Sequence, residues 1–148
     1  MTEIKNHPKR AVFDFENYEI SEFKFKKSDL VVDTFSIGFN PSGKFIVKES
    51  IFVISLGFNA AFEDPSSKET NEVISLTMNA TFRFEDIQVL ENIPDYFYRN
   101  ALGIMFPYLR AFVSTMTFQA NLRPPMILPI LNLMEIEQPL RENISIID

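Results

Sequence analysis

The sequence predicts an α+β fold in which an antiparallel sheet of about four strands precedes one long, proline-kinked C-terminal helix. Two patterns predict it. Through residues 72–85 apolar side chains alternate with polar ones, which is typical of a strand with one solvated face. After Pro94 the spacing of the apolar residues changes to that of an amphipathic helix. A chain of 148 residues is expected to form one domain over residues 1–148.

The N-terminal half carries the strand patterns. Residues 1–14 are polar and are expected to form a flexible arm. The expected strands then cover residues 18–27, 36–39, 44–62 and 72–85. Asn40-Pro41-Ser42-Gly43 is a turn signal, because proline fixes one backbone dihedral and glycine accepts a positive φ. The segment Glu63-Asp64-Pro65-Ser66-Ser67 is expected to form the hairpin loop before the last strand.

The helix pattern follows Pro94, which suits a first helical turn. Its apolar seam recurs every three or four residues. Pro107 lies with Gly103 on the opposite stripe, so we expect a bend away from that side, or two helices meeting there. We expect the seam to form oligomer contacts through Leu102, Met105, Leu109, Phe112 and Met116.

The C-terminal part is dominated by a proline-rich apolar run, LRPPMILPILNLM, which begins at Leu122. Pro124, Pro125 and Pro129 exclude a regular helix there. An extended, apolar segment of this kind is expected to cover something hydrophobic. Residues 135–148 are expected to form a short tail.

Composition and charge argue for a binding protein over an enzyme. The net charge of −6 disfavours nucleic acid, since phosphate contacts need clustered cations. The chain has no cysteine, one histidine (His7) and four glycines that form no phosphate-binding loop, so no catalytic residue, metal or cofactor is expected. No signal peptide or span of about 20 apolar residues is visible, which predicts a cytoplasmic protein without membrane insertion. The sixteen phenylalanines suit a large core, an interface or an apolar groove.

Two segments resemble a known family. Ile104-Met105-Phe106-Pro107-Tyr108-Leu109-Arg110, with Ser114-Thr115-Met116 after it, resembles the helix signature of SecB-type protein-export chaperones. The later run from Pro125 to Leu133 is similar to that family's proline-rich segment. The order of strands, long helix and apolar loop also matches.

The resemblance implies a homotetramer built as a dimer of dimers, and an ATP-independent holdase. Such a holdase binds unfolded preproteins and keeps them competent for export by the Sec pathway, with delivery to SecA. Glu22 matches an acidic position of the family's SecA-docking face, whereas Lys26 and Thr77 stand where acids are expected. The alternatives are a SecB-like chaperone that protects the antitoxin of a toxin–antitoxin module, and a specific non-catalytic binding module on the same fold. The expected client-binding residues, for each of which plain core or interface packing is the alternative, are Phe45, Phe52, Phe58, Phe62, Met126, Ile127 and Leu128.

Overall fold

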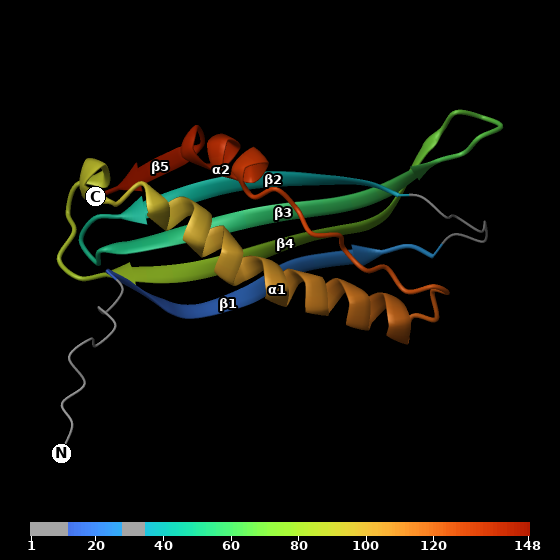
Figure 1. Cartoon of the computed structure of the whole chain (residues 1–148), viewed down its shortest axis with the longest axis horizontal. Coiled ribbons are helices and arrows are strands. Elements are labelled where there is room, and N and C mark those ends of the chain that lie inside the picture. Colours follow the sequence, from blue (N-terminus) through green and yellow to red (C-terminus); the bar gives the residue numbers. More distant parts are fainter. Residues whose placement is uncertain (1–11, 28–34) are drawn as a thin grey trace, which may run out of the picture.

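The computed structural model describes residues 12–27 and 35–148. Four strands are followed by a 3-10 helix, two α-helices and a fifth strand, so the predicted α+β class is confirmed (Figure 1). The elements are β1 (Phe13–Phe25), β2 (Ser36–Ile46), β3 (Ile51–Glu63), β4 (Thr70–Phe84), η1 (Leu90–Asn92), α1 (Tyr96–Gln119), α2 (Met134–Arg141) and β5 (Ile144–Ile147).

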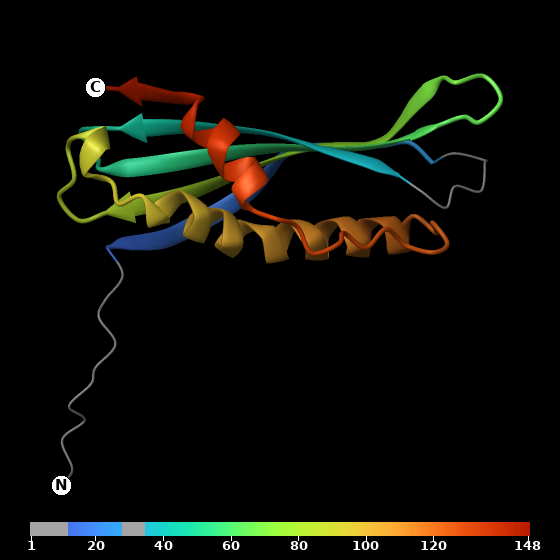
Figure 2. The same ribbon diagram turned by 45° about the horizontal axis from the view of Figure 1, so that its top comes forward.

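The strands form one sheet in the order β1-β4-β3-β2-β5. The first four strands pair antiparallel, whereas β5 runs parallel to β2. The sheet is therefore mixed and has one more strand than expected. Figure 2 shows β5 continuing the sheet beside β2. Strand β5 lies in the segment that was expected to be a tail, because four residues are too few to show a periodicity.

The turn between β2 and β3 lies at residues 47–50, so the turn expected at Asn40–Gly43 is wrong. Asn40 and Gly43 lie within β2, opposite Gly57 and Ile54 of β3. Ser50 supplies the positive φ of the real turn, 54°. Its hydroxyl oxygen accepts a hydrogen bond from the Ile87 N–H at 3.0 Å. This turn contains neither glycine nor proline, so no turn signal marks it in the sequence.

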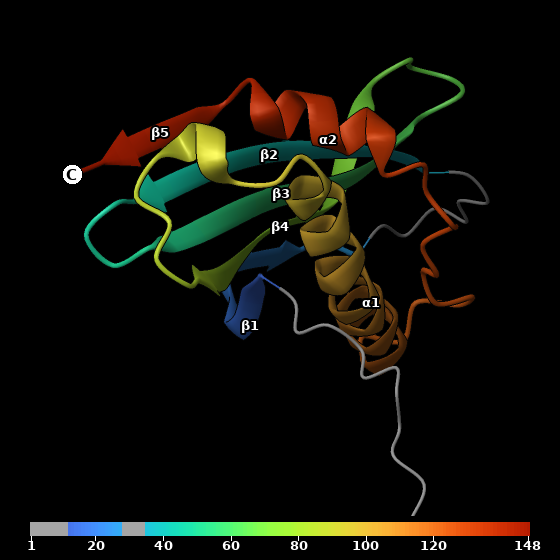
Figure 3. The same cartoon turned by 60° about the vertical axis from the view of Figure 1, so that its left-hand side comes forward.

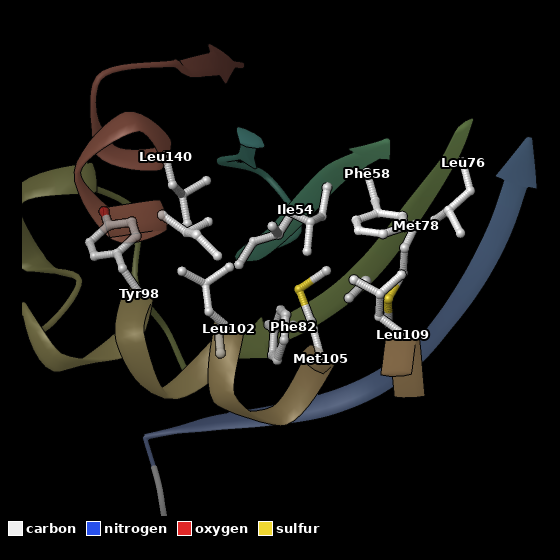
Figure 4. Close-up of a cluster of buried hydrophobic side chains, with 14 of the residues drawn as sticks. Ile54, Phe58, Leu76, Met78, Phe82, Tyr98, Leu102, Met105, Leu109 and Leu140 are labelled. Carbon is white, nitrogen blue, oxygen red and sulfur yellow. The ribbon is translucent and has the colours of Figure 1, made fainter. Parts of the chain in front are cut away.

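Both helices lie on one side of the sheet, with α1 across the face and α2 beside β2 (Figure 3). The sheet side chains that point toward α1 are mostly apolar and buried, whereas those of the opposite face are mostly polar and more exposed. Burial of each large apolar side chain contributes about 1.5–3 kcal/mol to stability. Figure 4 shows the resulting core, in which Ile54, Phe58, Leu76 and Met78 of the sheet meet Leu102, Met105 and Leu109 of α1.

Phe97 is the centre of an aromatic cluster that fixes the first turn of α1 on the sheet. Its side chain is fully buried. Five rings surround it at centroid distances from 4.8 to 5.5 Å, and most of them meet it edge-on or tilted, which aromatic quadrupoles favour. They belong to Phe13, Phe52, Phe82, Phe84 and Tyr98.

The helix α1 runs through Pro107 without a break over 24 residues, so the two-helix alternative is wrong. The predicted bend stays a prediction. Pro107 lies on the exposed side of α1, next to solvent. By length and composition alone α1 could cross a membrane, and the core helix of a soluble protein passes the same test. Eight of its 24 residues are buried within the subunit.

The predicted N-terminal arm and the predicted C-terminal tail compare differently with the structure. Residues 1–11 of the arm, His7 among them, lie outside the described residues, while Phe13 and Asp14 belong to β1. The predicted tail, 135–148, instead contains most of α2 and all of β5. Helix α2 was not expected from the sequence, because Pro139 lies inside it. The expectation of one domain over residues 1–148 stays a prediction.

Candidate polypeptide-binding surface

The four phenylalanines that were expected to contact clients from the sheet lie in the core instead. Phe45, Phe52, Phe58 and Phe62 are each 5% exposed or less. They occupy the side of β2 and β3 that faces the helices, and Phe52 packs edge-on against Phe97 at 5.3 Å. A buried ring has no surface to offer a client in this subunit, so a role of these four residues in client binding stays a prediction without an exposed surface behind it.

The other three expected client residues lie in the extended segment after α1, and they differ in solvent exposure. Met126 and Leu128 are buried, whereas Ile127 between them is 66% exposed. Two hydrogen bonds attach this extended segment to α1. The Met126 N–H donates to Thr117 Oγ1 at 2.9 Å, and Arg110 Nε donates to the Leu128 carbonyl at 2.7 Å. Only Ile127 of the three therefore remains available to a client.

More apolar side chains are exposed farther along the chain, in the connection between α1 and α2 and at the first residue of α2. Ile130 is 90% exposed and Met134 is 56% exposed. No charged residue occurs from position 124 to position 134. Several exposed apolar side chains along one uncharged segment differ from the isolated apolar side chains that are normal on a protein surface. We define the connector surface as Ile127, Ile130 and Met134, with the half-buried Leu131 and Leu133.

Ile130 and Met134 were missed as candidate client residues, although the same uncharged run contains them. The expected set stopped at Leu128, because the sequence alone does not tell which members of the run face the core. Prolines at both ends of Met126-Ile127-Leu128 keep the segment extended, so neighbouring side chains point to opposite sides. That alternation buries Met126 and Leu128 and exposes Ile127.

Polar contacts between α1 and α2 hold the far end of the connector. Arg99 Nε donates to Glu137 Oε2 at 3.0 Å, and Arg141 Nη2 lies 3.3 Å from Asp95 Oδ1. The Arg141 guanidinium also covers the Tyr98 ring, with 4.5 Å to the centroid. Burial raises the pKa of the Tyr98 hydroxyl, and the positive charge of Arg141 opposes that effect. Together these contacts fix α2 beside the start of α1.

The residues expected at an oligomer interface fall into two groups. Leu102, Met105 and Leu109 are fully buried under the subunit's own sheet, so they offer no surface to another chain. The seam packs on the sheet of the same subunit, and an interface role of these three residues stays a prediction that this packing does not favour. Phe112 and Met116 are half-buried, and the Phe112 ring meets Phe23 of β1 edge-on at 5.1 Å.

The sheet face opposite the helices has a polar hollow of about 350 Å³. Glu72 is the charged residue among those that line it. Nearby, Asn79 joins three strands, because Ser55 Oγ donates to its Oδ1 at 2.6 Å and its Nδ2 donates to Ser21 Oγ at 2.9 Å. In the described residues no three His, Cys, Asp or Glu side chains are grouped to hold a metal ion.

Comparison with solved structures identifies the architecture. The Mycobacterium tuberculosis Rv1957 SecB-like chaperone, in complex with a ChAD peptide from the Rv1956 HigA1 antitoxin, superposes with a TM-score of 0.67. The superposition covers 81% of this chain and 91% of that chain, at 18% sequence identity. This chain has a SecB-like fold. The identity is too low to carry more than the fold.

Other comparisons add little about the activity of this SecB-like subunit. No family model matches the chain. The uncharacterized protein MJ0357 of Methanocaldococcus jannaschii is 38% identical over 65 residues, which are 40% of this chain. The matched part spans only 41% of that relative's length. A protein of unknown function from Streptococcus agalactiae superposes with a TM-score of 0.38 over 80% of this chain and 97% of its own, at 12% identity.

Glu22, the expected SecA contact, lies on β1 at the edge of the SecB-like sheet. It is exposed and forms an ion pair with Lys24 at 3.1 Å. Thr77 of β4 lies opposite it in the sheet, so the acidic pattern of a docking face is interrupted there. An exposed ion pair of this kind contributes little to stability. A role of Glu22 in SecA docking stays a prediction.

Proposed function

We propose that this chain is a non-catalytic, ATP-independent chaperone that holds extended or unfolded polypeptide on the connector surface. The observation that carries the proposal is the set of exposed apolar side chains Ile127, Ile130 and Met134 in one uncharged segment, whose backbone is hydrogen-bonded to α1 at Met126 and Leu128. A holdase needs apolar surface that accepts many sequences, and methionine adapts its shape to different partners. The SecB-like fold supports the proposal, because the superposed neighbour is a chaperone with a bound peptide.

Two classes of client fit this surface. The first class is unfolded preproteins that are kept export-competent for the Sec pathway and passed to SecA from a cytoplasmic tetramer. The second is an antitoxin, which the chaperone of a toxin–antitoxin module would protect. The second class has the more specific support, since the ligand of the superposed chaperone is an antitoxin peptide. A binding module for a single partner would use the same surface with a narrower range.

The connector surface is tested by replacing its three most exposed side chains together, Ile127→Ser, Ile130→Ser and Met134→Ser. We expect client affinity to fall at least tenfold, because a client that covers these side chains gains well over the roughly 1.4 kcal/mol that corresponds to tenfold. Reduced, carboxymethylated α-lactalbumin serves as a permanently unfolded client. Its dissociation constant is measured by fluorescence anisotropy.

Val89→Ser is the matched control, because Val89 is 48% exposed and lies outside the connector surface. We expect this variant to bind the client like the unmodified chain. Thermal unfolding should be nearly unchanged in both variants, since exposed substitutions shift stability by about 0.5 kcal/mol or less each. Unchanged client affinity in a folded triple variant would show that clients bind elsewhere.

Assembly into a homotetramer through α1 is part of the proposal. With the seam buried, the surface left for another chain is the outer side of α1, which exposes Gly103, Pro107, Ala111, Thr115 and Phe118. Between Asn100 and Gln119 the only charged residue is Arg110, and its Nε is bonded to the Leu128 carbonyl. A face that is uncharged and built largely of small residues allows close helix packing.

Ala111→Asp is expected to separate the subunits without unfolding them. The new carboxylate would be desolvated at the centre of the helix–helix contact, which costs several kcal/mol, but stays in water on the free subunit. Light scattering after size exclusion should show a lower mass than for the unmodified chain. Ser67→Asp adds the same charge in the exposed β3–β4 turn and should leave the mass unchanged. A full-sized Ala111→Asp assembly would exclude this face.

A further inference from the structure

The edge of β2 that faces away from β3 is only partly occupied. Strand β5 pairs with Gly43–Ile46, which is the C-terminal part of β2. In the described part of the chain no strand pairs with residues 36–42 on this side. Figure 1 shows β2 extending past both α2 and β5 toward its N-terminal end. An uncovered strand edge of this kind is a template for pairing with another chain.

The direction of the backbone groups on this edge follows from the contacts that β5 makes. The Gly43 N–H donates to the Asn143 carbonyl at 2.9 Å, and the Val47 N–H donates to the Ile147 carbonyl at 2.8 Å. Backbone groups alternate in direction along a strand. The pairing of β2 with β3 is one-to-one without a bulge. The N–H and C=O groups of Ile37 and Phe39 therefore point to the same outer edge.

Pro41 separates the occupied part of this edge from the free part. Its position has the same parity as Gly43, so the N–H that proline lacks would have faced the outer edge. Its carbonyl accepts a hydrogen bond from Asn143 Nδ2 at 3.3 Å. Proline is tolerated at such edge positions because no pairing within the sheet is lost. The edge beyond it, at Ile37 and Phe39, has both donors and acceptors.

The side chains next to the free edge are apolar on the helix side. Phe39 is half-buried, and its ring lies 5.4 Å from Phe58 and 6.2 Å from Phe106 of α1. Ile37 is also half-buried against the core. An added strand would direct every second side chain to this apolar side and the others to the polar sheet face. The edge therefore suits an uncharged peptide with apolar residues at alternate positions.

We propose that the free edge of β2, at Ile37 and Phe39, takes an extended client segment as an additional strand. The inference rests on the proposed chaperone function and adds the mode of client binding. Main-chain hydrogen bonds can form with a peptide of any sequence, whereas the side chains at alternate positions determine which peptides bind best. The edge already accepts a strand of this kind, because β5 pairs with the C-terminal part of β2 although its Ile146 and Ile147 remain exposed.

The test uses an eight-residue peptide in which isoleucine and threonine alternate, with a lysine at each end for solubility. Amide hydrogen exchange is followed by NMR. In the free protein we expect fast exchange at Ile37 and Phe39, and slow exchange at Gly38 and Asn40, whose N–H groups face β3. Addition of the peptide should slow exchange at Ile37 and Phe39. The same peptide with alternate amides N-methylated should bind at least tenfold more weakly.

A pair of variants separates the backbone contact from the side chain. Ile37→Pro removes the N–H on the free edge, and Ile37→Ala removes most of the side chain but keeps the N–H. We expect Ile37→Pro to bind the peptide about five- to tenfold more weakly than Ile37→Ala, as for the loss of one hydrogen bond. Pro41 already occupies a β2 position whose N–H would face the same outer edge, so a proline at position 37 is expected to be tolerated. Circular dichroism checks that both variants are folded.

The outcomes distinguish this inference from the proposed function. Peptide binding with unprotected Ile37 and Phe39 amides, and with no effect of N-methylation, would overturn strand addition but leave the chaperone proposal in place. Failure of both the peptide and unfolded α-lactalbumin to bind would overturn both. Protection at the two amides together with the proline effect would establish strand addition.

Discussion

Leu109→Asp is expected to unfold the subunit, whereas the same substitution at an oligomer interface would only separate the subunits. Leu109 has no exposed surface and belongs to the buried cluster that includes Leu76 and Met78 (Figure 4). An aspartate there has no cationic partner in the apolar cluster. The uncompensated carboxylate would cost about 3–5 kcal/mol or more, in addition to the lost leucine packing. A domain is stable by only about 5–15 kcal/mol, so most of that stability is lost.

The measurement is thermal unfolding followed by circular dichroism, with light scattering on the same samples. We expect Leu109→Asp to lose its cooperative transition or to melt far below the unmodified chain. Leu109→Met keeps a similar volume and should cost less than about 1.5 kcal/mol. Ala111→Asp places the same charge two residues away on the outer side and should stay folded. A Leu109→Asp protein with native melting and reduced mass would mean that Leu109 contacts another subunit.

Strong periodicity explains which parts of the fold could be predicted. Strand β4 alternates from Ile74 to Phe84, and its buried positions there are those expected from the sequence, while Val73 is buried in addition. The apolar seam of α1 has a helical period through 24 residues. The β2–β3 turn could not be predicted, since Ser50 adopts its positive φ without glycine and is held by the distant Ile87. The position of that turn is therefore determined by tertiary contacts, which the local sequence does not show.

The candidate site was harder to predict than the fold. An apolar stripe has the same pattern whether it faces the core, another subunit or a client. Phe52 and Leu109 were assigned to surfaces for this reason, and both are core. Ile130 is distinguished from Leu128 only by the direction in which the folded connector turns each side chain. The sequence does show the uncharged run, and exposed and half-buried residues of that run make up the connector surface.

Phe97→Ala is expected to cause a similarly large loss of stability, and it tests how the sheet and α1 are joined. Phe97 is fully buried, and its ring contacts aromatic residues from β1, β3 and β4. Removal of the ring leaves a cavity among side chains that belong to different strands and cannot easily close it. Such substitutions cost about 3–5 kcal/mol. Urea denaturation should show a lower midpoint with an unchanged slope.

Tyr96→Ala is the matched control, because Tyr96 is the neighbouring residue of α1 and is 53% exposed. It should change the free energy of unfolding by about 0.5 kcal/mol or less. A small effect of Phe97→Ala would mean that the start of α1 is held mainly by the Arg141 contacts with Asp95 and Tyr98. Arg141→Ala would then be the more damaging change. The order of these two variants therefore shows whether aromatic packing or the polar contacts hold α1 on the sheet.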